Sequence, residues 1–202
     1  MANETEQKIM QVARRQFVQK GFAATRMQSI ADEAGINKAM VHYYFRSKEK
    51  LYREIVAHTL STVIPHFGKG LQAKGDTLDR LDSIVRTYME AIRANPDAPF
   101  FIMSELAQQR PDFITELRKR VHFEPAIFDL MQQMSTDIEA GKIRQIQPFQ
   151  LMLNVMSMCG FPFIAKPIFT NLMQLSESDF EALMEHRAQE VITFVRAALT
   201  PR

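Results

Sequence analysis

The chain has 202 residues, a formal net charge of +2 and 46% hydrophobic residues, which allows one or two domains with a substantial core. Its 7 Gly and 9 Pro exclude a loop-rich chain, and its single cysteine excludes an intramolecular disulfide. With no secretory signal and no apolar run near the roughly 20 residues of a membrane helix, we expect a soluble, cytoplasmic protein that makes no membrane contact.

Residues 4–20 are predicted to form the first helix, because apolar side chains recur there at helical spacing and Gly21 follows. Residues 1–53 carry a net charge of +5, whereas the rest of the chain carries −3. A basic N-terminal part followed by a slightly acidic remainder is expected if only the N-terminal part binds a polyanion such as DNA. A basic surface patch without function would give the same balance.

Residues 25–50 indicate a helix over 27–34, a corner at Gly35 and a second helix over 38–44. Ala31 is small enough for two helices to cross closely, Gly35 allows a positive φ at the corner, and Val41 can pack back on the first helix. This spacing fits the DNA-binding helix-turn-helix, whose second helix enters the major groove. The alternative is a plain helical hairpin with a polar surface.

The exposed face of the second helix would offer amide, ammonium, imidazole and phenol groups to base edges and phosphates. Thr25 is expected to cap the first helix of the motif. Ser47 would cap the next long helix and place Lys48 in a phosphate-binding helix start. The predicted DNA-binding residues are Thr25, Arg26, Gln28, Asn37, Lys38, Ala39, His42, Tyr43, Tyr44 and Lys48.

Residues 9–52 resemble the N-terminal domain of the TetR family of bacterial transcriptional repressors. The shared motifs are FVQKGF at 17–22, Thr25, IADEAGI at 30–36 and HYYFRSKEKL at 42–51. Two positions depart from the family. Gln28 replaces a frequent Arg and would favour adenine over guanine, and His42 replaces the usual Tyr, which would make one phosphate contact weaker or pH-sensitive.

The resemblance implies an all-α fold. A three-helix DNA-binding domain with the helix-turn-helix would occupy residues 1–47, and a larger helical domain for effector binding and dimerisation would occupy residues 48–202. A long helix is predicted from Ser47 to Ile64, ended by Pro65, Gly68 and Gly70. Further helices are predicted over residues 76–94, 96–107, 111–141 (kinked or divided at Pro125), 148–164 and 176–199.

Two of these helices are suited to pairing. Residues 148–164 are apolar almost all round and must be covered on both sides, and the last helix carries a seam with a repeat near 3.5 residues. Ordinary packing within the chain is the alternative. Because TetR-like proteins pair their last two helices in a four-helix bundle, the resemblance implies a homodimer and a palindromic operator. The predicted interface residues are Phe161, Ile164, Phe180, Met184, Arg187, Val191 and Phe194.

Methionine and phenylalanine side chains dominate the middle helices, and the resemblance implies an effector pocket there. Because methionine adapts to varied shapes, a small apolar effector is expected, although a plain core would show the same pattern. The predicted lining is Tyr88, Met89, Phe101, Met103, Phe113, His122, Phe128, Met131, Met152 and Met156.

No nucleophile–base arrangement, phosphate-binding Gly loop or metal-ligand spacing stands out, so we predict no enzyme activity, no cofactor and no metal site. The predicted function is a dimeric regulator, a repressor that leaves its operator when an effector binds. The alternative is a DNA-binding module whose C-terminal domain binds a protein partner and no small molecule.

Overall fold

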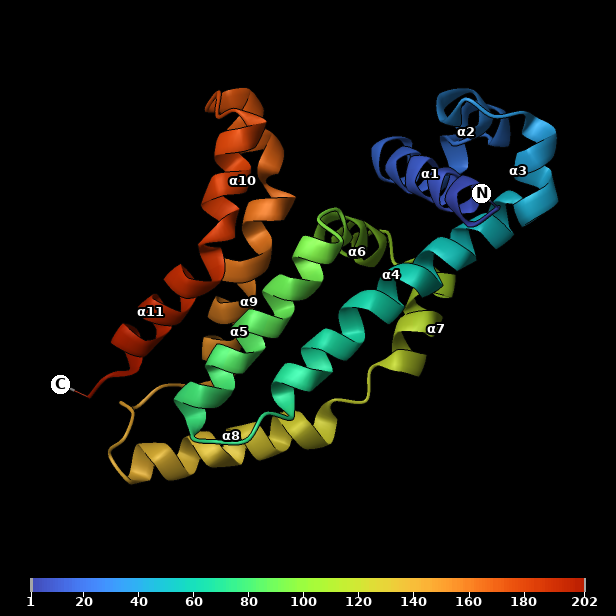
Figure 1. Cartoon of the computed structure of the whole chain (residues 1–202). Coiled ribbons are helices and arrows are strands. Elements are labelled where there is room, and N and C mark those ends of the chain that lie inside the picture. The colour runs from blue at the N-terminus through green and yellow to red at the C-terminus, as the bar shows by residue number, and fades with distance from the viewer. Residues whose placement is uncertain (1, 202) are drawn as a thin grey trace. The chain divides into compact units, whose positions relative to one another are not determined.

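The structure, a computed structural model, describes residues 2–201, and over that range it is built of helices without strands (Figure 1). The predicted all-α fold is confirmed. In chain order the elements are α1 (Ala2–Ala24), α2 (Met27–Ala34), α3 (Lys38–Phe45), α4 (Lys48–Leu71), α5 (Thr77–Ala94), α6 (Ala98–Ala107), α7 (Pro111–Arg120), α8 (Glu124–Glu139), α9 (Pro148–Ile164), the π-helical turn η1 (Ile168–Leu172), α10 (Glu177–Glu185) and α11 (Arg187–Leu199).

Packing groups the chain into two compact units. The first unit contains the chain up to Ser61 together with Phe100–Arg120, and the second contains Thr62–Pro99 together with the chain from Val121 onward. The domain boundary predicted between residues 47 and 48 lies at the end of the helix-turn-helix, whereas the first packing unit extends to Ser61 and includes Phe100–Arg120. In particular, the α6–α7 hairpin packs with the N-terminal helices.

The first unit has a small core under the helix-turn-helix. Ile30, Val41 and Phe45 are buried, and Ala31 is fully buried where α2 meets its neighbours. Gly35 has φ 65° and ψ 35°, and its N–H donates to carbonyls at the end of α2, as a left-handed helix cap does. The predicted positive φ of Gly35 is therefore confirmed, and Ala31 and Val41 are buried as their predicted roles require.

Helix α4 is longer than predicted. It continues to Leu71, so Pro65, Gly68 and Gly70 lie within it instead of ending it. Pro65 has no N–H for the carbonyl of Ser61, but losing one hydrogen bond does not end the helix. A Cβ on Gly70 would lie 2.8 Å from the Cα of Ile84 and 2.4 Å from Oγ1 of Thr87. Gly70 therefore permits a close approach to α5, and the prediction that these residues end the helix is wrong.

Gly70→Ala is expected to lower the free energy of unfolding by about 1–3 kcal/mol, although Ala is favoured over Gly in a helix by about 1 kcal/mol. The added methyl group would meet the α5 backbone, which cannot move aside as a side chain can. Urea unfolding measures the change. Gly68→Ala is the matched control, because the three atoms nearest to its Cβ all belong to the movable ring of Phe123, the closest at 2.9 Å. Equal stability of the two variants would refute the close approach.

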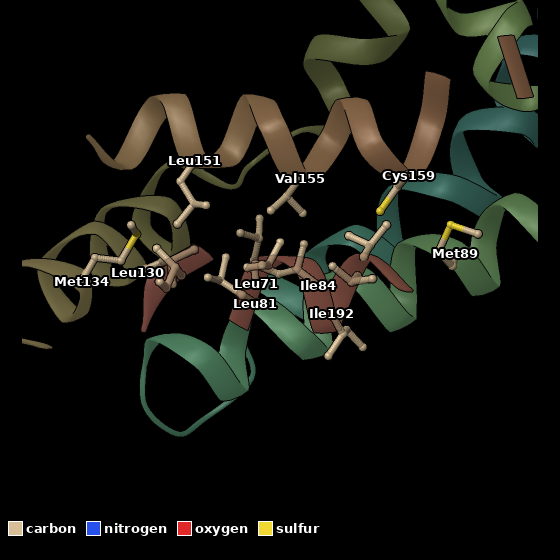
Figure 2. Close-up of a cluster of buried hydrophobic side chains, with 14 of the residues drawn as sticks. Leu71, Leu81, Ile84, Met89, Leu130, Met134, Leu151, Val155, Cys159 and Ile192 are labelled. Carbon is tan, nitrogen blue, oxygen red and sulfur yellow. The ribbon is translucent and has the colours of Figure 1, made fainter. Parts of the chain in front are cut away.

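The second unit has an extensive apolar core. Figure 2 shows Leu151, Val155 and Cys159 of α9 pointing toward side chains that include Leu81 and Ile84. Helix α5 packs against α8, α9 and α11, so the core joins segments far apart in the sequence. Each fully buried aliphatic side chain contributes about 1.5–3 kcal/mol, which makes this cluster the main source of the unit's stability.

A buried carboxylate joins the start of α5 to the end of α8. Asp137 accepts hydrogen bonds from the N–H and hydroxyl of Thr77 at 2.8 and 2.7 Å and from Lys142 Nζ at 3.0 Å. Burial alone would raise the pKa of Asp137, but the hydrogen bonds from Thr77, Lys142 and Gln133 hold it well below its usual range. Its contribution to stability is therefore complete above about pH 4 and is lost as the pH falls toward the folded pKa.

The last predicted helix is interrupted. Ser176 caps α10 by accepting from the N–H of Asp179, but α10 ends at Glu185 and α11 begins at Arg187. His186 lies between them with φ −94° and ψ −3°. The prediction of one continuous helix over 176–199 is wrong, so the seam predicted along it is divided between two helices. Within residues 2–201, no helix is both long and apolar enough to cross a membrane.

Candidate nucleic-acid interface

Helix α3 presents the predicted recognition surface. Asn37 is its N-cap, with its side-chain oxygen accepting from the N–H of Ala39 at 2.8 Å. Lys38, Ala39 and His42 are exposed, Tyr43 is 76% exposed, and Tyr44 is half-buried. This face can offer donors and acceptors to a groove without rearranging the core.

The turn after α3 was not foreseen from the sequence. Arg46 has φ 58° and ψ −46°, and the N–H of Ser47 donates to the carbonyl of Phe45 at 2.6 Å, which is a strained γ-turn for a residue with a side chain. His42 Nδ1 lies 3.1 Å from the carbonyl oxygen of Arg46. Because that oxygen only accepts, Nδ1 carries the hydrogen, and Nε2 is the ring nitrogen left for a further partner.

Gln28 lies on the exposed surface of α2, and its Nε2 donates to Asp32 Oδ1 at 2.7 Å. This bond uses one amide hydrogen, whereas a bidentate contact to adenine needs one hydrogen and the Oε1 oxygen. The bond to Asp32 is thus compatible with the predicted contact to adenine and would orient the amide for it.

Thr25 and Lys48 are engaged inside the first unit. The single hydrogen of the Thr25 hydroxyl is directed to the carbonyl of Gly21 at 2.8 Å, with the carbonyl of Gln16 at 3.2 Å, and α2 begins after Arg26 without a side-chain cap. The predicted capping role of Thr25 is therefore wrong. Ser47 does cap α4, since its Oγ accepts from the N–H of Lys50 at 3.1 Å. Arg26 is exposed.

The Lys48 ammonium makes three hydrogen bonds. It donates to the carbonyls of Phe22 at 2.9 Å, Ala23 at 3.3 Å and Thr25 at 2.9 Å. An ammonium has three hydrogens, so all are used in holding the end of α1. The predicted phosphate contact of Lys48 would compete with these bonds and stays a prediction.

A polar brace between α1 and α2 was also missed. Gln16 is buried, and its Nε2 donates to the carbonyl of Ser29 at 3.0 Å and to Glu33 Oε2 at 2.6 Å. The hydrogen bond from Gln16, followed by a second one from Arg15, lowers the pKa of the Glu33 carboxyl group. The available signal was a glutamine placed beside Val12 and Phe17 on the apolar face of the first helix.

The predicted pocket residues divide between the two units. Phe101, Met103 and Phe113 belong to the first unit, where Met103 is exposed and the other two are buried against each other. In the second unit Met89 is part of the core, whereas His122 and Phe128 are exposed. Partial burial is shared by Tyr88, Met131, Met152 and Met156. The predicted lining residues therefore do not all belong to one unit, and the pocket stays a prediction.

The predicted interface residues differ in exposure. Phe161 and Phe194 are 55% and 64% exposed, whereas Phe180 and Val191 are 3% and 1% exposed and pack within the chain. Arg187 donates to the carbonyl of Met158, and Ile164 and Met184 are half-buried. Other exposed apolar side chains were missed, namely Phe149 and Leu153 on α9, Leu172, Met173 and Leu183.

A helix-turn-helix with an exposed polar second helix, joined to a larger helical body, is the architecture of DNA-binding transcriptional regulators. Residues 9–55 match the family described as "Bacterial regulatory proteins, tetR family". Residues 78–195 match the family described as "Tetracyclin repressor-like, C-terminal domain". The chain belongs to the TetR family, which confirms the resemblance inferred from residues 9–52.

Characterised relatives are distant. The transcriptional activator FasR of Mycolicibacterium smegmatis is 25% identical over 131 residues, covering 64% of this chain and 59% of FasR. The repressor KstR2 of Rhodococcus jostii is 28% identical over 113 residues, covering 54% of this chain and 55% of KstR2. The chain thus spans little more than half the length of these relatives. The solved structure of KstR2 of Mycobacterium tuberculosis has a TM-score of 0.74 at 18% identity, covering 98% and 95% of the two chains.

Proposed function

We propose that the chain is a cytoplasmic, dimeric repressor that binds a palindromic operator and leaves it when a small apolar effector binds the C-terminal domain. The observation that carries the DNA-binding part is the exposed face of α3, with Lys38, His42 and Tyr43 available on a helix fixed by the cap of Asn37. Lys38 and Gln28 would read base edges, and the Tyr43 hydroxyl would hold a phosphate.

Dimerisation is supported by large apolar side chains that are about half exposed or more among the described residues of the second unit. On α9, Phe149 and Leu153 are four residues apart and so are neighbours on the helix surface, and Phe161 lies further along the same broad side, about 120° around from Phe149. Phe194 on α11 is similarly exposed. A two-fold dimer would cover such faces and present two α3 helices to successive turns of one groove face.

The effector is supported by an aromatic and methionine-rich region of the second unit. Phe67 lies edge-on to both Tyr88 and Phe123, at centroid distances of 6.0 and 5.4 Å, and burial raises the pKa of Tyr88 to about 12. Half-buried methionines 152, 156 and 158 lie on α9. An apolar effector would release the operator only by binding the low-affinity state more tightly. KstR2 of Mycobacterium tuberculosis is described as a ketosteroid transcriptional regulator, so a steroid is the first probe to try.

Selection of bound sequences from a random duplex pool, at about 0.15 M ionic strength, tests the proposal. We expect a palindrome with half-site centres about 10 base pairs, or somewhat more, apart. Lys38→Ala should relax the selected sequence, whereas Lys69→Ala, an exposed lysine of the second unit, should not. Recovery of no motif would overturn sequence-specific DNA binding. Unchanged operator affinity at saturating steroid would reject that effector, and a reporter gene would distinguish repression from activation.

A further inference from the structure

We propose that Arg110, in the turn between α6 and α7, is a positioning residue for the helix-turn-helix. This inference rests on the proposed DNA-binding function. Arg110 lies outside the N-terminal family match at residues 9–55, yet it belongs to the same compact unit as the motif. Its side chain joins the α6–α7 hairpin to the segment that leads into α2.

The guanidinium of Arg110 lies against two aromatic rings. Its central carbon is 4.1 Å from the ring centroid of Phe22 and 4.3 Å from that of Tyr52. The two rings also contact each other edge-on, with centroids 5.1 Å apart. A cation over an aromatic face contributes about 0.5–2 kcal/mol, most where water is excluded, so this arrangement fixes the three side chains together.

A buried carboxylate anchors Arg110 from the hairpin side. Glu105 is 2% exposed, accepts a short hydrogen bond from the Tyr52 hydroxyl and lies 3.4 Å from Arg110 Nε. Burial raises the pKa of Glu105, while the Tyr52 hydrogen bond and the Arg110 charge oppose that rise. A buried carboxylate without its cation would be destabilised, so Glu105 keeps Arg110 in the turn.

From Phe22 the contacts continue to the start of the motif. The Lys48 ammonium lies 4.5 Å from the Phe22 ring centroid and donates to the Phe22 and Thr25 carbonyls. Thr25 is followed by Arg26, after which α2 begins. Arg110 thus reaches the first turn of the helix-turn-helix through Phe22 and Lys48, without lying on α2 or α3 itself.

The role follows from how tightly a recognition helix must be held. Displacing a binding group by about 1 Å is enough to lose much of an interaction, so residues that fix the entry to α2 affect affinity without touching DNA. Arg110 makes no phosphate contact in this role. Its removal should therefore change affinity without changing the number of counterions released on binding.

Two measurements on the full-length protein test Arg110→Gln, with Arg118→Gln, an exposed arginine of α7 in the same hairpin, as the control. Amide hydrogen exchange should be faster over residues 22–34 in Arg110→Gln but unchanged in the α5 and α9 core. Affinity for the selected operator, corrected for the active fraction by stoichiometric titration, should fall about tenfold with an unchanged salt slope. Arg110→Lys should recover part of both, because it restores the charge but not the planar guanidinium.

Each failure has a distinct meaning. Unchanged exchange over residues 22–34 would overturn the positioning role, whether or not an operator is found. Unchanged operator affinity in Arg110→Gln would do the same. A salt slope reduced by about 0.9 for each subunit would assign Arg110 to a phosphate instead. Absence of operator binding by the unaltered protein would reject the proposed function, while the exchange measurement would still decide whether Arg110 holds the motif.

Discussion

Replacing Lys48 with Met is expected to lower the free energy of unfolding of the protein by about 2–4 kcal/mol. The substitution keeps the apolar stem but removes the ammonium that three carbonyl oxygens share. Two of these hydrogen bonds are partly buried, so water can replace them only in part. The contact with the Phe22 ring, at 4.5 Å, is lost as well.

The same variant distinguishes two roles for Lys48. If the ammonium holds the end of α1, operator affinity falls but the dependence of affinity on salt keeps its slope. If Lys48 binds a phosphate in the complex, the slope falls by about 0.9 for each subunit while stability changes little. Urea unfolding and operator titrations at several salt concentrations measure the two effects. Lys50→Met, an exposed lysine two residues along α4, is the stability control.

The sequence was sufficient for the helix-turn-helix because its determinants are local. Ala31, Gly35 and Val41 lie within eleven consecutive positions, and each has a steric requirement that only small, flexible or branched residues meet. The left-handed conformation of Gly35 is the clearest example. These features can be read without knowing what surrounds them.

The predictions on Gly70 and Lys48 differ from the structure because both residues contact positions far away in the sequence. Gly70 looks like a helix breaker until Ile84 and Thr87 are placed against it. Lys48 looks like an exposed cation near DNA, because its acceptors lie 23 to 26 residues earlier in the chain. Tertiary packing overrides local preference in both cases, and sequence spacing alone does not reveal it.

The predicted seam on the last helix failed for a related reason. Periodicity identifies an apolar stripe but not whether the same chain or another one covers it. Phe180 and Val191 belong to that stripe and are buried within the second unit, whereas Phe194 is exposed. The interruption at His186 further separates Phe180 from the residues of α11.

The difference in exposure between Phe194 and the buried Phe180 and Val191 predicts which substitution separates the proposed dimer. Phe194→Glu should weaken dimerisation by at least about a thousandfold, because losing an aromatic interface anchor costs about 2–4 kcal/mol and two-fold symmetry removes it twice. The change places a charge where a partner's apolar surface would lie. Because Phe194 is 64% exposed, the fold of each subunit should survive.

Sedimentation at several protein concentrations would measure the dissociation constant, and operator titrations would measure the consequence for DNA. Separated subunits should bind a half-site weakly, because they lose the affinity gained by linking two DNA-binding units. Phe128→Glu is the matched control, since Phe128 is 70% exposed on α8 in the same unit but outside the α9–α11 surface. If Phe194→Glu stayed dimeric while Phe128→Glu dissociated, the interface would lie on α8. If both stayed dimeric, neither phenylalanine would anchor the pair, and the stripe of Phe149, Leu153 and Phe161 would be the next surface to alter.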